Sequence, residues 1–534
     1  MSSFTPDLEL KEQIHRRRTF AIISHPDAGK TTLTEKLLLY SGMIHTAGMV
    51  RGRKGRRAAA SDWMAMEQER GISITSSAMQ FVYKETVINI LDTPGHEDFS
   101  EDTYRTLTAA DCAIMVIDAA KGVEKQTRKL FEVCRLRKIP VMTFINKMDM
   151  PGRDPLDLMN EVENVLQIQS CAINWPIGTG RQFAGVYSRP TKECLIFGKT
   201  STGGAQKVDI HHYPLENSEI LKLVGAEEFH KLKEELQLLE MAGNPFNQEE
   251  FLAGRVTPVF FASALTNFGV EPFFDAFIRY APSPQARPAK RLDGEEILID
   301  PVATPFSAYV FKIQANMDKK HRDSMAFLRI CSGVFERDLV VKHHRLGREV
   351  RLSRPQSMLA GERTTLDTAY AGDVIGVINP GVFALGDTIS LSGGFTFNPL
   401  PQFQPEIFAK IFPKDVGKRK WFDKGVVQLT EEGAIQLLRP YDDYGDTIFA
   451  AVGQLQFEVL QYRLRDEYGV ETTLMPISYK CSAWLIGDVK TFQKPTDALL
   501  VRDRWDRPMV LFAGQWDKNY AIKQNPQHQF ADFI

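Results

Sequence analysis

An eight-residue loop between an apolar run and a helical pattern constrains the fold of this chain more than any other feature. Residues 24–31 read Ser-His-Pro-Asp-Ala-Gly-Lys-Thr; they follow the apolar run 19–23 and precede the helical periodicity of residues 32–40. A phosphate-binding loop requires this order of strand, loop and helix, because its backbone N–H groups face an anion at the helix N-terminus. Ser24 stands where the pattern usually has glycine, which costs little if its φ is negative. Read alone, the octet could be an ordinary connection from strand to helix.

Within this loop, different residue types suit different tasks at a triphosphate. Gly29 lets the backbone approach the anion closely, Lys30 brings an ammonium group to the β- and γ-phosphates, and Thr31 offers a hydroxyl to Mg²⁺. The candidate nucleotide-binding residues of this segment are Ser24, His25, Pro26, Asp27, Ala28, Gly29, Lys30, Thr31 and Thr32. The loop therefore predicts a bound nucleotide with a magnesium ion.

A second motif, Asp-Thr-Pro-Gly-His at residues 92–96, directly follows the apolar run 87–91. A carboxylate at the end of a strand can hold Mg²⁺ through a water molecule, and the N–H of Gly95 can sense a γ-phosphate. Alone, Asp-Thr-Pro-Gly is also a common turn. The candidate nucleotide-binding residues here are Asp92, Thr93, Pro94, Gly95 and His96.

A third motif, Asn-Lys-Met-Asp at residues 146–149, follows the apolar run 141–145. The Asp149 carboxylate can accept hydrogen bonds from the ring N–H and the exocyclic amine of guanine, whereas adenine has neither donor on that edge. A site built around such a carboxylate rejects the wrong base strongly, because its charge would be unpaired. Asn146 would tie this loop to the phosphate loop, although it could also be a polar helix cap. The candidate residues are Asn146, Lys147, Met148 and Asp149.

The fourth and weakest motif is Ser-Ala-Leu at residues 263–265, after the apolar run 256–262. A backbone N–H of Ser263, Ala264 or Leu265 could bind O6 of guanine. All four motifs follow predicted strands, and ligands of open α/β sheets bind at the carboxyl ends of the strands. Together, in this order, they predict a single site for GTP or GDP with Mg²⁺.

The alternation of strands and helices predicts an α/β fold with a doubly wound, mostly parallel sheet, and the four motifs on it would make this a P-loop GTPase domain. We expect this domain to span residues 1–285, with an insert at about 168–254 that interrupts the alternation, and to end in the proline-rich segment 281–288. Short apolar runs separated by Gly and Asp then predict a β-barrel domain over residues 286–395. A mixed pattern predicts an α+β C-terminal domain over residues 396–534.

Composition limits the classes of protein that this chain can belong to. Its 534 residues carry a formal net charge of -2, which argues against coating free nucleic acid by bulk charge. No signal segment or apolar run of roughly 20 residues is visible, so we expect a cytoplasmic protein without a membrane span. Cysteines without Cys-x-x-Cys spacing suggest neither a disulfide framework nor a zinc site. They are Cys112, Cys134, Cys171, Cys194, Cys331 and Cys481.

These motifs resemble the translational GTPases, the group that contains elongation factors Tu and G. Residues 62–75 resemble the first switch of that group and residues 92–96 resemble its second switch. The bacterial peptide chain release factor 3 family is the most similar, on residues 24–31, 95–105 and 144–149. The resemblance implies a ribosome-stimulated GTPase of translation termination. Such a protein promotes dissociation of class 1 release factors after peptide release and does not read stop codons itself.

The same resemblance implies roles for individual residues. Thr31 and Ser73 would be the hydroxyl ligands of Mg²⁺, and Asp92 would hold the ion through water, although the family usually has threonine where Ser73 stands. His96 would be the catalytic residue, which orients the attacking water or stabilises the transition state. The implied partners are the ribosome, with its RNA and proteins, and functionally the class 1 release factors. The protein would be a monomer when it is not on the ribosome.

Three alternatives remain open from the sequence. The chain could be a translocase-like or ribosome-protection GTPase, but those proteins continue through two further domains after the third. It could also be a guanine-nucleotide-binding switch that does not hydrolyse GTP, which the presence of His96 disfavours. The basic segments 51–57 and 414–424 could contact ribosomal RNA, or they could simply be solvated surface.

Overall fold

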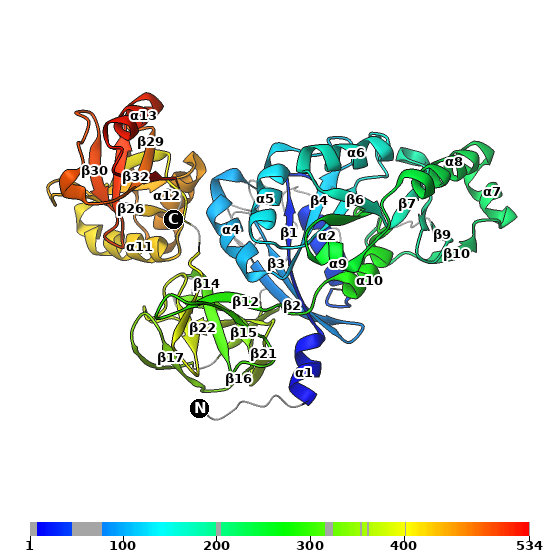
Figure 1. The fold of residues 1–534 in the computed structure, drawn as a ribbon, viewed down its shortest axis with the longest axis horizontal. Coiled ribbons are helices and arrows are strands. Elements are labelled where there is room, and N and C mark those ends of the chain that lie inside the picture. Colours follow the sequence, from blue (N-terminus) through cyan, green and yellow to red (C-terminus); the bar gives the residue numbers. More distant parts are fainter. Residues whose placement is uncertain are drawn as a thin grey trace.

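The protein folds into three domains, which are coloured from blue to red along the chain in Figure 1. We call them the N-terminal domain (residues 8–280), the barrel domain (residues 287–397) and the C-terminal domain (residues 402–532). The computed structural model describes residues 8–44, 77–94, 96–198, 204–315, 324–352, 355–359, 362–400 and 402–532. Four predicted features lie outside the described residues, namely Gly95, Ser73, the first-switch segment 62–75 and the basic segment 51–57.

The N-terminal domain is a seven-stranded sheet in the order β2-β3-β1-β4-β5-β11-β6, with helices on both faces (Figure 1). Neighbouring strands from β3 to β6 are parallel, and β2 is antiparallel to β3. The strands are β1 (Arg17–Ser24), β2 (Ser77–Tyr83), β3 (Thr86–Asp92), β4 (Cys112–Asp118), β5 (Val141–Asn146), β6 (Gln169–Ala172) and β11 (Val256–Phe261). The helices are α2 (Lys30–Tyr40), α4 (Ser100–Ala109), α5 (Lys125–Leu136), α6 (Pro155–Leu166), α9 (Gln248–Leu252) and α10 (Val270–Tyr280). The predicted doubly wound, mostly parallel sheet is confirmed.

Alternate residues of β1 face the two helical layers. Phe20 and Ile22 belong to the core that includes α2 and α10, while Ala21 and Ile23 belong to the core that includes α4, α5 and α6. All four side chains are fully buried. Because helices cover both faces of this parallel sheet, its strands are continuous apolar runs, which is why they were visible in the sequence.

A smaller antiparallel sheet, ordered β10-β9-β8-β7, lies beyond the edge of the main sheet together with two helices (Figure 1). Its elements are β7 (Asn174–Ile177), β8 (Gly185–Ser188), β9 (Glu193–Phe197), β10 (Ile210–Pro214), α7 (Ser218–Val224) and α8 (Ala226–Ala242). The structure corrects the predicted start of the insert at residue 168. Residues 169–172 form β6, which pairs in parallel with β11 in the main sheet. This strand reads Gln-Ser-Cys-Ala, so it is too short and too polar to register as an apolar run.

The barrel domain contains an eight-stranded antiparallel sheet in the order β18-β17-β23-β14-β15-β22-β19-β20. Its strands are β14 (Ser307–Gln314), β15 (Met325–Ser332), β17 (Val340–His343), β18 (Arg348–Arg351), β19 (Gln356–Leu359), β20 (Glu362–Thr365), β22 (Val374–Ile378) and β23 (Thr388–Ser390). Two smaller sheets, ordered β13-β12-β24 and β16-β21, complete the domain; their strands are β12 (Arg287–Arg291), β13 (Glu296–Ile299), β16 (Val334–Glu336), β21 (Thr368–Tyr370) and β24 (Phe395–Phe397). Helix α1 (Leu8–His15) packs on this domain, because Leu10 and Ile14 are buried in its apolar core.

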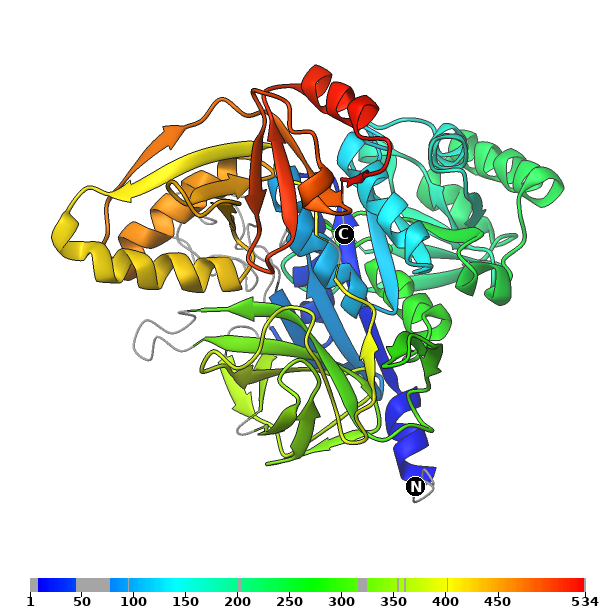
Figure 2. The same cartoon turned by 60° about the vertical axis from the view of Figure 1, so that its left-hand side comes forward.

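The C-terminal domain is an eight-stranded sheet, ordered β28-β25-β27-β26-β30-β31-β29-β32, with three helices. The strands are β25 (Ile407–Pro413), β26 (Gln436–Pro440), β27 (Ile448–Ala451), β28 (Thr472–Pro476), β29 (Cys481–Ile486), β30 (Leu499–Arg502), β31 (Pro508–Phe512) and β32 (Gln529–Ala531). Figure 2 shows α11 (Arg419–Glu431) and α12 (Gln454–Tyr468) on one side of this domain and α13 (Gln515–Gln524) at its top. The predicted barrel and α+β folds are thus confirmed. Throughout the described ranges, no helix is both long and apolar enough to cross a membrane.

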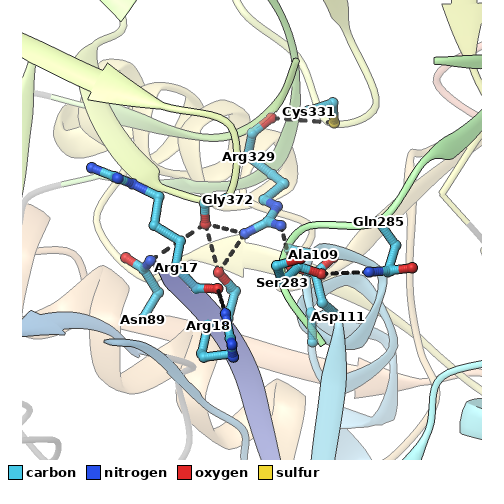
Figure 3. A network of polar contacts seen from close by, with 12 residues as sticks. Arg17, Arg18, Asn89, Ala109, Asp111, Ser283, Gln285, Arg329, Cys331 and Gly372 are labelled. Atoms are coloured by element: carbon cyan, nitrogen blue, oxygen red, sulfur yellow. Dashed lines mark hydrogen bonds and ion pairs between the residues drawn. The ribbon is translucent and has the colours of Figure 1, made fainter. Parts of the chain in front are cut away.

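A buried network of charges joins the N-terminal domain to the barrel domain (Figure 3). The Asp111 carboxylate, between α4 and β4, accepts hydrogen bonds from Arg329 of β15 and from Arg287 of β12, the latter at 2.9 Å. Nearby, Arg17 of β1 is paired with Asp373 of the barrel domain, with 2.8 Å between Nε and Oδ2. Since Asp111 and Arg329 are only 1% exposed, the two domains share one desolvated ionic interface.

Replacing Asp111 with asparagine should destabilise this interface by about 3–5 kcal/mol, because it leaves the buried guanidinium group of Arg329 and the partly buried one of Arg287 without their anion. We expect a lower midpoint of urea unfolding, followed by circular dichroism. A suitable control is Glu250→Gln, since Glu250 pairs with Arg255 on the surface and its loss should leave the midpoint unchanged. Equal midpoints for Asp111→Asn and the unmodified protein would show that the network contributes little.

Candidate nucleotide-binding site

The predicted phosphate loop lies between β1 and α2 as the sequence indicated. Ser24 is the last residue of β1 and has the extended backbone of a strand, so it does not need the freedom of glycine. Asp27 and Gly29 have φ angles of 65° and 103°, which turn the chain before Lys30 begins α2. The N–H of His25 donates to Oγ1 of Thr127, 3.1 Å away on α5. The loop is therefore anchored to a neighbouring helix at its start.

Asn146, at the end of β5, connects three of the four motifs. Its Nδ2 donates to the carbonyl oxygen of Ala28 at 2.8 Å, and its Oδ1 accepts from the N–H of Ala264 at 2.9 Å. A Cβ added to Gly29 would lie 2.1 Å from the same Nδ2, so a larger residue cannot occupy this position without displacing Asn146. Through the two hydrogen bonds of its side chain, Asn146 joins the phosphate loop to the Ser-Ala-Leu segment.

The Gly29→Ala variant should bind guanine nucleotide at least about tenfold more weakly, because a left-handed backbone costs a non-glycine residue roughly 1–2 kcal/mol. The clash with Asn146 adds to this cost. Isothermal titration with GDP would measure the change in Kd. The matched control is Gly42→Ala, which has a comparable φ of 82° but no atom within 4 Å of its added Cβ. Equal losses of affinity in both variants would contradict a specific role of the loop geometry.

Lys30 and Asp92 bring a buried cation and a buried anion together beside the loop. Their Nζ and Oδ1 atoms lie 2.5 Å apart, and the side chains are 7% and 3% exposed. Asp92 ends β3, and the next residue, Thr93, donates through Oγ1 to the carbonyl oxygen of Ile22 on β1 at 2.7 Å. The second motif is thereby fixed against the strand that leads into the phosphate loop. The site thus holds an ammonium group of the kind that suits phosphate oxygens beside a carboxylate of the kind that suits a hydrated Mg²⁺.

The base end of the site is formed around Lys147 and Asp149, after β5. The Nζ of Lys147 donates to the carbonyl oxygen of Asp27 at 2.6 Å and to Oδ2 of Asp118 at 2.8 Å. Burial raises the pKa of Asp118, but the hydrogen bonds from Lys147 and from the N–H of Ala120 outweigh it, and the net pKa lies below the ordinary value. Asp118 is therefore held as a carboxylate that fixes the lysine.

Asp149 carries the observation that best fits guanine. Its Oδ1 is buried, and within the part of the chain that the structure describes it has no hydrogen-bond partner. A buried carboxylate oxygen without a donor is costly, so such an atom fits a ligand that brings N–H groups. The donor-bearing edge of guanine is a ligand of this kind.

The Ser-Ala-Leu segment is partly used by the protein itself. The N–H of Ser263 donates to the carbonyl oxygen of Phe268 at 2.8 Å, and the N–H of Ala264 donates to Asn146. Leu265, the third residue of the segment, is 43% exposed. Of the three predicted N–H groups, that of Leu265 is thus the strongest candidate for a contact with O6 of guanine.

His96 follows the second motif and leads into the short turn η1 (Glu97–Phe99). Its side chain is 39% exposed, and its Nδ1 accepts a hydrogen bond from the N–H of Asp98 at 3.3 Å. The Nδ1 edge of the His96 ring therefore faces η1.

Sequence reasoning missed two residues of the site, Asp118 and Thr127. Asp118 ends β4, so its position at the carboxyl end of a buried strand was a usable signal. Thr127 lies inside α5, a helix that the sequence predicted without any site residue, and no local pattern marks its hydroxyl as an anchor for His25.

The fold and this arrangement define a guanine-nucleotide-binding GTPase of the elongation factor Tu type. The family model described as "Elongation factor Tu GTP binding domain" matches residues 15–283. The model "Elongation factor G domain 2" matches residues 305–392, and "Class II release factor RF3, C-terminal domain" matches residues 397–522. A crystal structure from Thermus thermophilus has a similar fold, with a TM-score of 0.68 at 21% identity over 91% of this chain and 72% of that one.

Curated relatives narrow the assignment. The chain is 53% identical to "Peptide chain release factor 3" of Synechocystis sp., over 95% of this chain and 93% of the relative. It is 52% identical to the protein of that name from Gloeobacter violaceus, over 98% of both chains, and 51% identical to that of Symbiobacterium thermophilum, over 97% of both. The chain belongs to the peptide chain release factor 3 family and is a GTPase of translation termination.

Proposed function

We propose that this chain uses GTP to dissociate class 1 release factors from the ribosome after peptide release, without reading stop codons itself. The observation that carries the proposal is the similarity to release factor 3 proteins along nearly the whole chain, including the C-terminal domain. The ribosome and, functionally, the class 1 release factors are then its partners. The protein would act in the cytoplasm, where ribosomes work, and as a monomer between rounds.

The phosphate end of the site would be formed by the loop and by Lys30. The backbone N–H groups at the end of the loop and the start of α2 would face the phosphate oxygens, supported by the conformation of Gly29. The Lys30 ammonium would neutralise charge on the β- and γ-phosphates, and its position beside Asp92 supports this role.

Mg²⁺ would be held by the hydroxyls of Thr31 and Ser73, with Asp92 reaching it through water. When bound, the ion neutralises charge on the phosphate oxygens and so aids phosphoryl transfer. Asp92 is 2% exposed at the end of β3, where it meets the loop. The buried Asp92 carboxylate beside the Lys30 ammonium fits a site that must bind both a cation, Mg²⁺, and an anion, the phosphate.

The base end of the site would select guanine through Asp149. Lys147, which is hydrogen-bonded to Asp27 and Asp118, would cover this end of the site. Asp149 would accept the ring N–H and the amine, and the N–H of Leu265 would bind O6. The unpaired Oδ1 of Asp149 supports this assignment.

For hydrolysis, His96 would orient the attacking water or stabilise the transition state. Loss of the γ-phosphate would release Ser73 and Gly95, and the domains would then shift against one another. We propose domain limits at residues 1–285, 286–395 and 396–534. The segments matched by the three family models support this division.

The proposed function can be tested on terminated ribosomes that carry a fluorescent class 1 release factor. Adding the protein with GTP should accelerate dissociation of that factor relative to ribosomes alone. Unchanged dissociation would count against the proposal. Movement of mRNA under the same conditions, read by toeprinting, would instead favour a translocase-like activity.

A further inference from the structure

The turn η1, directly after His96, is held by the C-terminal domain. The Asp98 carboxylate accepts a hydrogen bond from the N–H of Leu455, with 2.7 Å between Oδ2 and N. Leu455 lies in the first turn of α12, where backbone N–H groups lack partners within the helix. Asp98 therefore supplies an anionic acceptor to the positive end of a helix in another domain.

Apolar contacts reinforce this attachment. Phe99 of η1 forms a cluster with Leu455 and Val459, and the three side chains are 8%, 8% and 4% exposed. Two residues of one three-residue turn thus contact α12, Asp98 through its carboxylate and Phe99 through its buried ring. The turn cannot keep its position if α12 moves away.

Gly453, just before α12, lets the C-terminal domain lie directly against Asp98 of the N-terminal domain. A Cβ added to Gly453 would lie 2.0 Å from Cγ of Asp98 and 2.2 and 2.3 Å from the two carboxylate oxygens. The φ of Gly453 is -139°, a value that any residue can adopt, so the backbone does not require glycine here. The absence of a side chain is required by Asp98.

Asp98 also determines the position of the His96 ring. Its backbone N–H donates to Nδ1 of His96, and its Oδ1 lies 3.5 Å from the same nitrogen. One residue is therefore bound to α12 through its carboxylate and to His96 through its backbone.

We propose that Asp98 is a positioning residue that makes the orientation of His96 depend on the contact between η1 and α12. While α12 is docked, Asp98 and Phe99 fix the turn, and the turn fixes the ring. A shift of the C-terminal domain frees the turn and lets His96 reorient. The link to hydrolysis rests on the catalytic role proposed above for His96, whereas the link between α12 and the ring does not.

Two variants break the contact from opposite sides. Gly453→Ala should displace the Asp98 carboxylate by steric clash, and Asp98→Ala removes the acceptor altogether. Asp98→Asn keeps a side-chain oxygen for the Leu455 N–H and should retain most of the coupling. The matched control is Gly514→Ala, because Gly514 precedes α13 in the same domain with a φ of -166°, and its added Cβ would approach only Asp517, at 3.7 Å.

The first readout is the ratio of ribosome-stimulated to basal kcat for GTP hydrolysis. We expect this ratio to fall about tenfold to a hundredfold in Gly453→Ala and Asp98→Ala, with the KM for GTP within about twofold, because a small misplacement of a positioned group has effects of this size. Asp98→Asn and Gly514→Ala should stay close to the unmodified protein. An unchanged ratio in both disruptive variants would overturn the coupling to hydrolysis.

The second readout is the ring nitrogen signal of His96 in ¹⁵N-histidine-labelled protein, assigned by its loss in His96→Gln. We expect the Nδ1 signal to move in Gly453→Ala and Asp98→Ala but not in Gly514→Ala. An unmoved signal in both disruptive variants would overturn the proposal even if the protein hydrolyses GTP normally. If the signal moves while His96→Ala leaves hydrolysis unchanged, the positional link stands and the catalytic role of His96 fails.

Discussion

The Asp149→Asn variant should lose roughly 10⁴-fold in affinity for GDP and GTP, and should bind xanthine nucleotides more tightly than the unmodified protein does. The reason is the exchange of an acceptor for a donor. The asparagine amide presents N–H groups toward the N–H groups of guanine, whereas xanthine carries an oxygen in place of the exocyclic amine. The buried, unpaired Oδ1 of Asp149 makes the penalty large, since little water can compensate the mismatch.

Isothermal titration with GDP and XDP would measure both changes on one preparation. The control is Asp157→Asn, an equal change of charge on the exposed face of α6, which should leave both affinities unaltered. Retention of the original preference for guanine in Asp149→Asn would refute the contact and with it the base-selecting role of this loop.

The His96→Ala variant should keep its nucleotide affinity and lose about 10²–10³-fold in ribosome-stimulated GTP hydrolysis, a loss typical of removing one stabilising donor from a transition state. Affinity should survive because the contacts that fix the phosphate loop come from Thr127, Asn146 and Lys147 rather than from His96. Single-turnover kinetics on ribosomes would separate the chemical step from product release.

His230→Ala provides the comparison for this experiment. His230 lies on α8, in the small sheet region at the edge of the N-terminal domain, and its removal should leave turnover unchanged. If His96→Ala hydrolyses GTP on ribosomes as fast as the unmodified protein, His96 has no catalytic role, and the chain would have to stabilise the transition state by other means.

The parallel sheet could be predicted from the sequence because its strands are buried on both faces. The runs of β4 and β5 are apolar except for Thr143, and each ends in a polar residue at the edge where ligands of such sheets bind. Strands β2 and β6 were missed. Both are edge strands of the main sheet, and β6 has only four residues, so neither produces a continuous apolar run.

The site could be predicted where its chemistry is local. Gly29, Lys30 and Asp149 belong to short motifs whose residue types follow from phosphate and guanine chemistry. Contacts between distant residues could not be predicted. Asp98 and Leu455 are separated by 357 positions, and no local pattern indicates that one accepts a hydrogen bond from the other.

The charged interface between the N-terminal and barrel domains could not be predicted either, because it too depends on contacts between distant residues. Arg17, Asp111 and Arg329 look in the sequence like ordinary surface charges, yet all three are buried in the structure. A charge is buried only when its partner is brought to it, and the partners lie on strands of two different domains. Such pairs become recognisable only after the domains have been placed.

The first helix of the chain has a consequence for how the molecule can be divided. Because Leu10 and Ile14 complete the hydrophobic interior of the barrel, residues 287–397 expressed as a separate fragment would expose apolar surface to water. Helix α1 leads within two residues into β1, whose opposite end is Ser24 of the phosphate loop. An eight-residue strand therefore separates the helix that packs on the barrel from the loop after Ser24, so a fusion or deletion at the amino terminus would disturb both together.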